Sequence, residues 1–390
     1  MAAPTQDEGP DFPPLDAYHE EGGEPAKNVK LNGSNSLEDI VYQRIADVKA
    51  KPINWLWPGR LARGKFSIIV GNAGLGKSQV CCSLAAITSK GGFWPVDRTE
   101  AYQGSVIILS AEDDVEDTIR PRLEAAGADL DNVYILEAIS VEDDKTKETK
   151  KRSFNLAADT TRLAALMQHI KDESGLPVAL VIIDPISAYL GNADSHNNAE
   201  VRALLSPLQY VAAKHQAAML GVSHLTKAQG VDALLRLQGS VAFGAAARSV
   251  WGIAKDKDDP QRRLMLPLKN NLGKDDTGFA YSLQSFLLEG SEPPIGTSHV
   301  MWEKEKVTIS AEEAFAQGAK DFTEHSMLDD AKAFLRDFLA NGAQRVDKVE
   351  REAKRAGVSA ATLKRAKVEL RLIAAKQDFE GPWEWRLPQQ

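Results

Sequence analysis

An eight-residue glycine-rich segment between an apolar run and a helical pattern constrains this chain more than any other feature. The segment matches G-x-x-x-x-G-K-[ST] and reads Gly71-Asn72-Ala73-Gly74-Leu75-Gly76-Lys77-Ser78. The preceding run, Phe66 to Val70, predicts a buried strand, and Ser78 to Thr88 predicts a helix. Glycines allow consecutive backbone N–H groups to face one anion, and a helix N-terminus adds partial positive charge. A phosphate-binding loop is therefore predicted, with a chance match in a glycine-rich turn as the alternative.

The start of the predicted helix carries the chemistry that a bound nucleotide needs. Lys77 is expected to reach the β- and γ-phosphates, and the hydroxyl of Ser78 is expected to bind Mg²⁺. Gln79 is expected to line the same site. The predicted cofactors are ATP and Mg²⁺. The only two cysteines, Cys81 and Cys82, are neighbours on this helix, which argues against a structural disulfide and a thiolate zinc site.

The rest of the first three hundred residues alternates between strand and helix patterns. Apolar runs rich in Val and Ile occur at Ser105 to Leu109, Val133 to Leu136, Val178 to Ile183 and Ala217 to Val222, with helical patterns at Leu163 to Ile170 and Val201 to Ala213. This alternation predicts an α/β fold with a mainly parallel sheet covered on both faces. Beyond Arg248 strands follow one another and are expected to extend the sheet as hairpins.

Composition sets the class of protein and the expected boundaries. The chain of 390 residues is 43% hydrophobic and has no apolar run near the roughly 18 residues of a membrane span, nor a signal peptide, so a cytoplasmic location and no membrane partner are expected. Residues 1–50 are expected to be a disordered, acidic, Pro-rich tail, and residues 51–310 the nucleotide-binding domain. Residues 311–325 are expected to be a linker, and residues 326–390 a second domain.

Two acidic positions that follow predicted strands are expected to complete the nucleotide site. Asp184 ends the run Val178 to Ile183 and is expected to hold Mg²⁺, which prefers oxygen ligands. The alternative is an Asp that caps a turn before Pro185. Glu112 begins an acidic cluster after another strand, and its alternative role is to cap the helix that begins near Val115.

The order of these motifs carries a resemblance. With Lys77, Glu112, Asp184 and the strand end Gly221-Val222-Ser223-His224 in sequence, the chain resembles the RecA-like superfamily of P-loop ATPases. Over about Trp55 to Leu283 it resembles the plasmid RepA-type hexameric helicases and related ATPases of phages and mobile elements. The resemblance implies that Glu112 polarises the attacking water and that His224 senses the γ-phosphate. A His at a strand end is otherwise more often structural.

Three further basic residues take roles from the resemblance alone. Arg248 matches an arginine that reaches the nucleotide of the next subunit, and its alternative is a surface Arg beside an edge strand. Arg122 matches an arginine that lies against the adenine. Lys269 matches the lysine of a Lys-x-Arg-x-Gly hairpin that enters a neighbour's site, but Asn271 stands where the Arg would be. The resemblance also implies a homo-oligomer, with a hexamer as the expected form, and DNA as partner.

Two loops and the C-terminal segment are the expected nucleic-acid surfaces. In RecA-like rings two loops face the channel, and here the matching loops carry Asn197, Lys227 and Arg236, with ordinary surface loops as the alternative. Residues 345–371 hold nine Lys and Arg against four acids in a chain of net charge -8. Their pattern resembles a winged helix-turn-helix with Lys364, Arg365 and Lys367 on its second helix. A module for protein contacts is the alternative.

The residues leave three functions open. The first is a ring-forming, ATP-driven DNA motor, such as a replicative helicase of a phage, plasmid or mobile element. The second is a RecA- or KaiC-like ATPase that mediates or regulates recombination without unwinding. The third is a DNA-binding regulator whose ATP site only controls assembly. Glu112, His224 and Arg248 together favour the first two, because they would complete a hydrolytic site.

Overall fold

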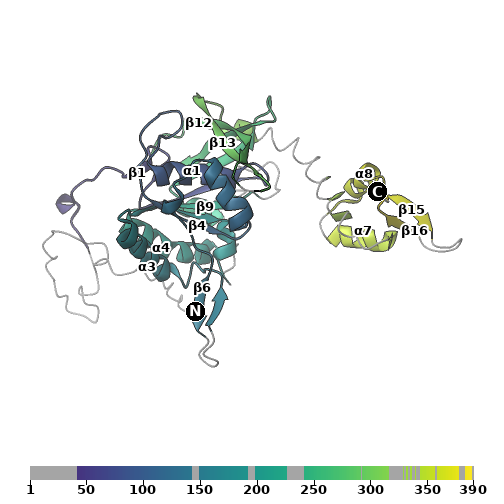
Figure 1. Ribbon diagram of the computed structural model, residues 1–390, viewed down its shortest axis with the longest axis horizontal. Coiled ribbons are helices and arrows are strands. Elements are labelled where there is room, and N and C mark those ends of the chain that lie inside the picture. Colours follow the sequence, from purple (N-terminus) through teal and green to yellow (C-terminus); the bar gives the residue numbers. More distant parts are fainter. Residues whose placement is uncertain are drawn as a thin grey trace, which may run out of the picture. The chain divides into compact units, whose positions relative to one another are not determined.

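The computed structural model comprises two compact units, residues 1–312 and 313–390, which are described separately (Figure 1). In the first unit the structure describes residues 42–142, 149–191, 198–225, 241–290 and 292–312. In the second it describes 313–315, 328, 331–332, 334–335, 339, 343–355, 358–376 and 383–388. Most of the predicted acidic tail and most of the predicted linker lie outside these residues. No helix within the described ranges is long and apolar enough to cross a membrane.

A nine-stranded sheet forms the centre of the first unit, in the order β13-β12-β11-β10-β3-β9-β8-β4-β5. The strands are β3 (Phe66–Gly71), β4 (Ser105–Ser110), β5 (Val133–Ile135), β8 (Val178–Asp184), β9 (Ala218–His224), β10 (Ser249–Lys255), β11 (Arg262–Asn270), β12 (Gly278–Leu288) and β13 (Ile295–Val307). The six strands from β5 to β10 pair in parallel, whereas β10 to β13 pair antiparallel as consecutive hairpins. The predicted α/β fold with a mainly parallel sheet is confirmed.

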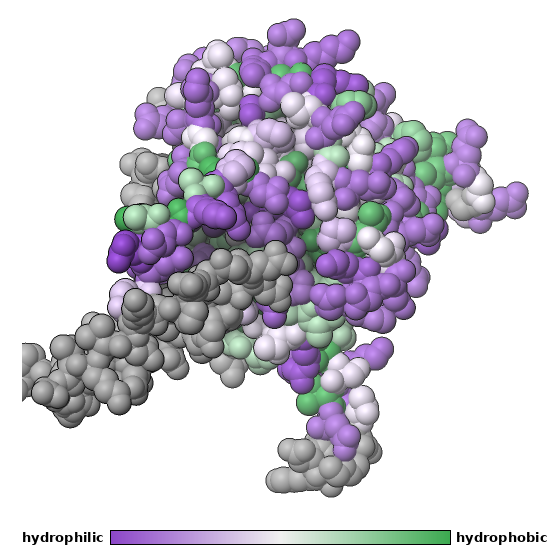
Figure 2. Space-filling view, turned by 90° about the vertical axis from the view of Figure 1, so that its left-hand side faces the viewer, coloured by the Kyte–Doolittle hydropathy of each residue, from purple (hydrophilic) through white to green (hydrophobic). Residues whose placement is uncertain are grey.

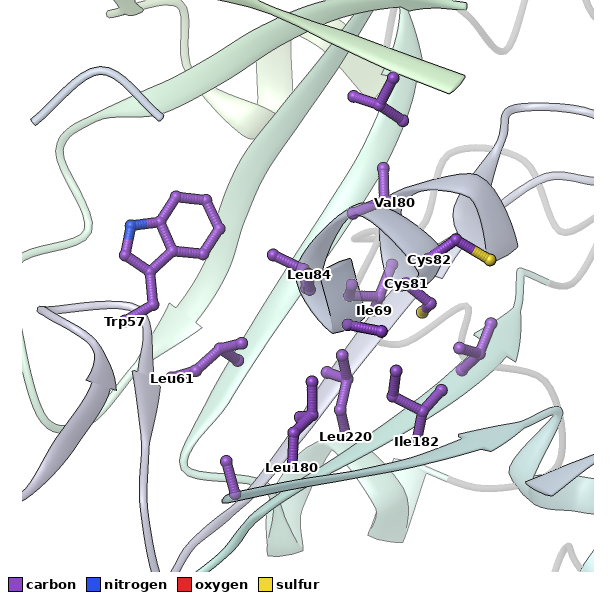
Figure 3. Close-up of a cluster of buried hydrophobic side chains, with 14 of the residues drawn as sticks. Trp57, Leu61, Ile69, Val80, Cys81, Cys82, Leu84, Leu180, Ile182 and Leu220 are labelled. Carbon is purple, nitrogen blue, oxygen red and sulfur yellow. The ribbon is translucent and has the colours of Figure 1, made fainter. Parts of the chain in front are cut away.

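Helices cover both faces of this sheet (Figure 1). They are α1 (Lys77–Lys90), α2 (Arg120–Ala125), α3 (Thr160–Ser174), α4 (Asn198–His215) and α5 (Val241–Ala246). On one face, Val80 and Leu84 of α1 pack over sheet residues such as Ile69, Leu180 and Leu220 (Figure 3). α3 and α4 contact each other and lie on the other side. Because β3 and β8 are buried at every position, their continuous apolar runs are those of central parallel strands.

An aromatic cluster explains the Trp-rich segment before the glycine-rich loop. Trp57 lies in the short strand β1 (Trp55–Trp57), which pairs with β2 (Leu61–Ala62). Its ring stacks on Trp94 with centroids 5.1 Å apart and also contacts Phe279 and Trp302. The cluster therefore joins the segment before β3 to the distant hairpin β12–β13. A second hairpin, β6 (Ile139–Glu142) with β7 (Thr149–Arg152), lies outside the central sheet.

The second unit has its own core, to which α-helices, a three-stranded antiparallel sheet and residues between 328 and 339 contribute. The elements are β14 (Gln344–Arg345), α7 (Val346–Arg355), α8 (Ala360–Glu369), β15 (Ile373–Lys376) and β16 (Trp383–Arg386), and the strand order is β14-β16-β15. Ser359 caps α8 by accepting a hydrogen bond from the backbone N–H of Thr362. Leu335, Val349, Leu363 and Trp385 are buried in this core. The two-residue strand β14 was not predicted, since so short a strand has no periodicity.

One face of the molecule, shown in Figure 2, is covered largely by hydrophilic residues, and its hydrophobic residues occur in small groups. The larger apolar side chains that are exposed in the described residues include Phe286, Leu287 and Ile295, which lie on the outer part of the hairpin β12–β13. In the other strands of the central sheet, the large apolar side chains of the described residues are buried or half-buried.

Candidate nucleotide site

The carboxyl ends of four neighbouring parallel strands meet at one edge of the sheet. Register aligns Gly71 at the end of β3 with His224 at the end of β9, and Ser110 at the end of β4 with Asp184 at the end of β8. The glycine-rich loop and the segment of Glu112 leave this same edge. The structure thus brings together residues that are spread over about 150 positions of sequence, because parallel strands share one polarity.

The loop between β3 and α1 has the backbone of an anion site. Gly74 and Gly76 have φ angles of 73° and 85°, in the left-handed region that glycine adopts without strain. Helix α1 begins at Lys77 without a side-chain cap, so its first N–H groups have no side-chain acceptor. They are available to an anion, as the sequence pattern predicts.

Lys77 is almost completely buried at the base of this loop, with 6% of its surface exposed. Its Nζ donates to the carbonyl oxygens of Gly71 at 3.1 Å and Asn72 at 3.0 Å, and lies 3.3 Å from Nδ1 of His224. Burial lowers the pKa of the ammonium group, and the negative charges of Asp184 and Glu112 oppose this shift. The lysine is therefore held by weak, replaceable acceptors rather than by an ion pair.

Ser78 and Asp184 form the pair of oxygens expected for Mg²⁺. Ser78 Oγ donates to Asp184 Oδ2 at 2.6 Å. Burial raises the pKa of the Asp184 carboxyl, and the bond from Ser78 works against this shift. Hard divalent cations such as Mg²⁺ prefer oxygen ligands of this kind. Both oxygens therefore fit a divalent ion of the kind that ATP carries.

The three residues of the acidic cluster after β4 make different contacts. Asp114 caps the following helical turn by accepting from the N–H groups of Glu116 and Asp117. Asp113 forms an ion pair with Arg122 at 2.6 Å. Glu112 takes no part in the cap: its Oε1 lies 3.8 Å from Nε2 of His224, and 60% of its side chain is exposed. The alternative role of helix cap is thus filled by a neighbour.

His224 lies between the lysine and the glutamate. Its pKa is lowered, first by burial and then by the charge of Lys77. A neutral ring that accepts from Lys77 through Nδ1 must carry its proton on Nε2, which faces Glu112. The ring therefore connects the phosphate side of the site to the solvent-accessible carboxylate.

Arg122 lies beside the site, close to Ser78 and Asp184. Together with Asp113, Ser78, Asp184 and the two cysteines it lines a small cavity. Its ion pair with Asp113 holds the guanidinium in place. The predicted contact of Arg122 with adenine remains a prediction. The partner Asp113 was not identified from sequence, because the contact depends on how α2 packs.

Arg248 and Lys269 lie at the opposite edge of the sheet. Ser249, the first residue of β10, pairs with Ser67 near the start of β3, whereas Gly71 pairs with Ile253. Four residues of strand, or about 13 Å, therefore separate Arg248 from the loop of its own chain. The Arg248 side chain is exposed. Lys269 Nζ donates to the carbonyl oxygens of Gly244, Ala245 and Ala247 at the end of α5, at 2.9–3.0 Å. Within one chain Lys269 holds a helix end, and the predicted roles of both residues in a neighbour's site remain predictions.

Three predicted nucleic-acid residues, Asn197, Lys227 and Arg236, lie outside the described residues. In the second unit Lys364 and Arg365 are exposed on α8. Lys367 differs from the prediction of an exposed face: it is partly buried, with Nζ 4.6 Å from the centre of the Trp385 ring. A lysine stem packed on an aromatic ring contributes to the core as well as to surface charge.

The hairpin β12–β13 supplies contacts that the sequence did not reveal. Tyr281 Oη donates to the carbonyl oxygen of Leu75 at 2.9 Å, inside the glycine-rich loop. Gln79 Nε2 donates to Ser298 Oγ at 2.8 Å, so this predicted site residue faces the hairpin. More than 200 positions separate these partners, and only the folded sheet brings them together.

Comparison with known proteins places this geometry in a family. No curated protein matches the chain. Residues 36–230 match the family model described as AAA domain, which is half of the 390 residues. The matched range holds the glycine-rich loop, Glu112, Asp184 and His224, but neither Arg248 nor the second unit. The chain belongs to the AAA domain family, and its first unit is a RecA-like P-loop ATPase core.

Proposed function

We propose that the chain is an ATP-hydrolysing, ring-forming DNA motor, with the activity of a RepA-like replicative helicase of a phage, plasmid or mobile element. The convergence of Lys77, His224 and Glu112 at one sheet edge carries this proposal. It joins a phosphate-binding loop to a carboxylate that is exposed enough to meet water.

The loop and its neighbours would bind the phosphates of ATP. The uncapped N–H groups of α1 face the anion, and Lys77 would exchange the carbonyls of Gly71 and Asn72 for phosphate oxygens. Ser78 and Asp184 would hold Mg²⁺, directly or through water, since hard cations prefer oxygen ligands. When bound, this ion neutralises charge on the β- and γ-phosphates.

Glu112 is the group positioned to activate water. In the proposed step, a water oxygen bonds to the γ-phosphorus while the bond from that phosphorus to the β–γ bridging oxygen breaks, and Glu112 accepts the proton of the water. His224 lies 3.8 Å from Glu112 and 3.3 Å from Lys77, so a shift of either neighbour changes its contacts. The imidazole of His224 is thus suited to sense whether the γ-phosphate is present.

The position of Arg248 supports assembly into a ring. An arginine at the edge opposite to its own loop cannot reach that loop, but it can face the loop edge of a second copy. Stabilisation of the transferring phosphoryl group by an arginine in trans is a known device of such ATPases. The proposed motor therefore needs at least two copies for each complete site.

ATP hydrolysis measured with and without single-stranded DNA, followed by strand displacement on forked DNA, tests the proposal. We expect hydrolysis that single-stranded DNA accelerates, and displacement that requires ATP. Hydrolysis without displacement would support the mediator or regulator of recombination instead. A chain that binds ATP but does not hydrolyse it, with or without DNA, would contradict the motor.

The second unit supports a duplex-binding role. Its order of helix, turn, capped helix and hairpin resembles that of a winged helix-turn-helix, in which the second helix enters the major groove. Here the second helix is α8, with Lys364 and Arg365 exposed on it. We propose that α8 contacts duplex DNA through its phosphates.

Reversing the charge of Lys364 and Arg365 to Glu should weaken duplex binding by about tenfold or more at low salt and reduce its salt dependence, because phosphate contacts release counterions. Lys367 stays unchanged, since it packs on Trp385. The control is Lys348→Glu with Arg351→Glu, an equal charge change on exposed positions of α7. Electrophoretic shifts over a salt series measure the effect, and circular dichroism checks folding. Equal duplex affinity in the folded α8 variant would make the unit a protein-contact module.

A further inference from the structure

The hairpin β12–β13 lies against the phosphate-binding loop and the first turns of α1. Tyr281 bonds to Leu75, Ser298 bonds to Gln79, and Trp302 Nε1 donates to Ser83 Oγ at 3.0 Å. A methyl group built on Gly76 would lie 3.1 Å from Cδ1 of Leu283, so this side chain closes the loop from the same side. The contacts follow one face of the hairpin. Tyr281 and Leu283 lie two positions apart on β12, and Trp302 and Ser298 lie four positions apart on β13, so all four side chains are on the same face.

The bond from Tyr281 fixes the direction of one peptide in the loop. In a trans peptide the carbonyl and the following N–H point in opposite directions. Tyr281 is fully buried and holds the Leu75 carbonyl toward the hairpin, so the N–H of Gly76 points away from it. Gly76 directly precedes Lys77, where the uncapped N–H groups of α1 begin, so its N–H continues the same run of backbone donors.

We propose that the hairpin β12–β13 holds the loop in its phosphate-binding conformation, with Tyr281 as the positioning residue that sets the Leu75–Gly76 peptide. This inference rests on the proposed nucleotide site and assigns a role to residues outside the matched family range. Tyr281 would act through the backbone of the loop, by its bond to the Leu75 carbonyl.

The loop needs such a contact because two of its residues are glycines with a flexible backbone. Gly74 and Gly76, on either side of Leu75, both have positive φ, and a methyl group on Gly74 would meet nothing within 4 Å. Glycine adopts many other conformations at little cost. Without the bond, the Leu75–Gly76 peptide would lose this constraint, and the N–H of Gly76 would be free to change direction.

The phenol is a dependable donor for this purpose. Its ring is fully buried and packs against Trp302 with centroids 5.3 Å apart, which restricts its movement. Burial raises the pKa of Tyr281 far above its usual range, so the hydroxyl keeps its proton at any working pH. The hydrogen bond therefore does not depend on conditions under which the protein would bind ATP.

The test is Tyr281→Phe, which removes one oxygen atom and keeps the ring. We expect the dissociation constants of ATP and ADP to rise by about tenfold, because binding must now restore the peptide orientation. KM should rise similarly while kcat stays within about twofold, since the loop binds the ground state and the transition state alike. Titration calorimetry and steady-state kinetics measure the two effects.

Ser83→Ala is the matched control. It also removes one buried hydroxyl and breaks a bond between α1 and the hairpin, but this bond lies away from the loop. It should lower the melting temperature without changing ATP affinity. A merely structural role of Tyr281 would give the two variants the same result: lower stability and normal affinity.

Unchanged ATP affinity in folded Tyr281→Phe overturns the inference. If that variant does not fold, Leu283→Ala decides, because Leu283 is only partly buried and borders Gly76. Its ATP affinity should fall by about threefold, and normal affinity would equally overturn the inference. Failure of the wild-type chain to bind ATP would instead remove the proposed function, so the two failures are distinguishable.

Discussion

Replacing Glu112 with Gln should lower the rate of ATP hydrolysis by about 10²-fold or more while ATP binding stays within a few-fold of normal. The amide keeps the size and polarity of the side chain but cannot accept the proton of the attacking water. Because Glu112 is largely exposed and takes no part in the helix cap, its loss should leave the fold and the phosphate contacts intact. Single-turnover hydrolysis and calorimetric titration with ATP separate the two effects.

Glu116→Gln is the control for that experiment. Glu116 is an exposed acid four positions away, on the helical turn that Asp114 caps, so the same chemical change is made in the same segment. It should hydrolyse ATP at the normal rate. Near-normal turnover in Glu112→Gln would remove this residue from the chemical step and leave the site as a nucleotide-binding switch.

Replacing Lys77 with Met should weaken the binding of ATP by about 10²-fold and abolish measurable turnover. Hydrogen bonds from an ammonium group to phosphate are among the strongest in proteins, and this lysine is the cation at the base of the loop. Met keeps the length of the buried stem, so the pocket should stay filled. Lys77→Arg serves as the comparison, since it keeps the charge but not the fit.

Calorimetric titration with ATP and with ADP measures the loss, and thermal unfolding without nucleotide checks the fold. The melting temperature of Lys77→Met should be close to normal or higher, because removing a buried charge relieves desolvation, which also lowers the pKa of the lysine. ATP affinity within a few-fold of the wild type would show that the backbone N–H groups suffice and that the loop does not work as proposed.

The parts of the fold that are local in sequence were predictable. The run Val178 to Ile183 of β8 is apolar at every position because both faces of a central parallel strand are buried. The glycine-rich loop is recognisable from Gly74 and Gly76, which adopt left-handed φ angles. Strand polarity then places Asp184 and His224 at one edge. For these residues the pattern and the structure agree, because burial of the central strands and their common polarity determine both.

The remaining site contacts depend on packing between distant segments. Arg122 reaches Asp113, nine positions earlier, only because the chain folds back at the start of the helical segment, and Lys269 holds α5 because β11 ends beside it. Lys367 reads as a surface charge from helical periodicity, but Trp385 arrives from another strand and covers its stem. Tyr281 carried no signal at all, since a core tyrosine and a loop-positioning tyrosine have the same sequence pattern.

The separation of the loop edge from the edge of Arg248 has a geometric consequence for assembly. In the proposed assembly each copy would present Arg248 on one side and its phosphate-binding loop on the other, so copies would join head to tail through heterologous contacts. A closed circle of n copies then has n complete sites, whereas an open array of the same length has one fewer. Opening the circle to admit a strand of DNA would silence one ATPase site, and the rotation between neighbours, not the chemistry of the site, would decide between circle and filament.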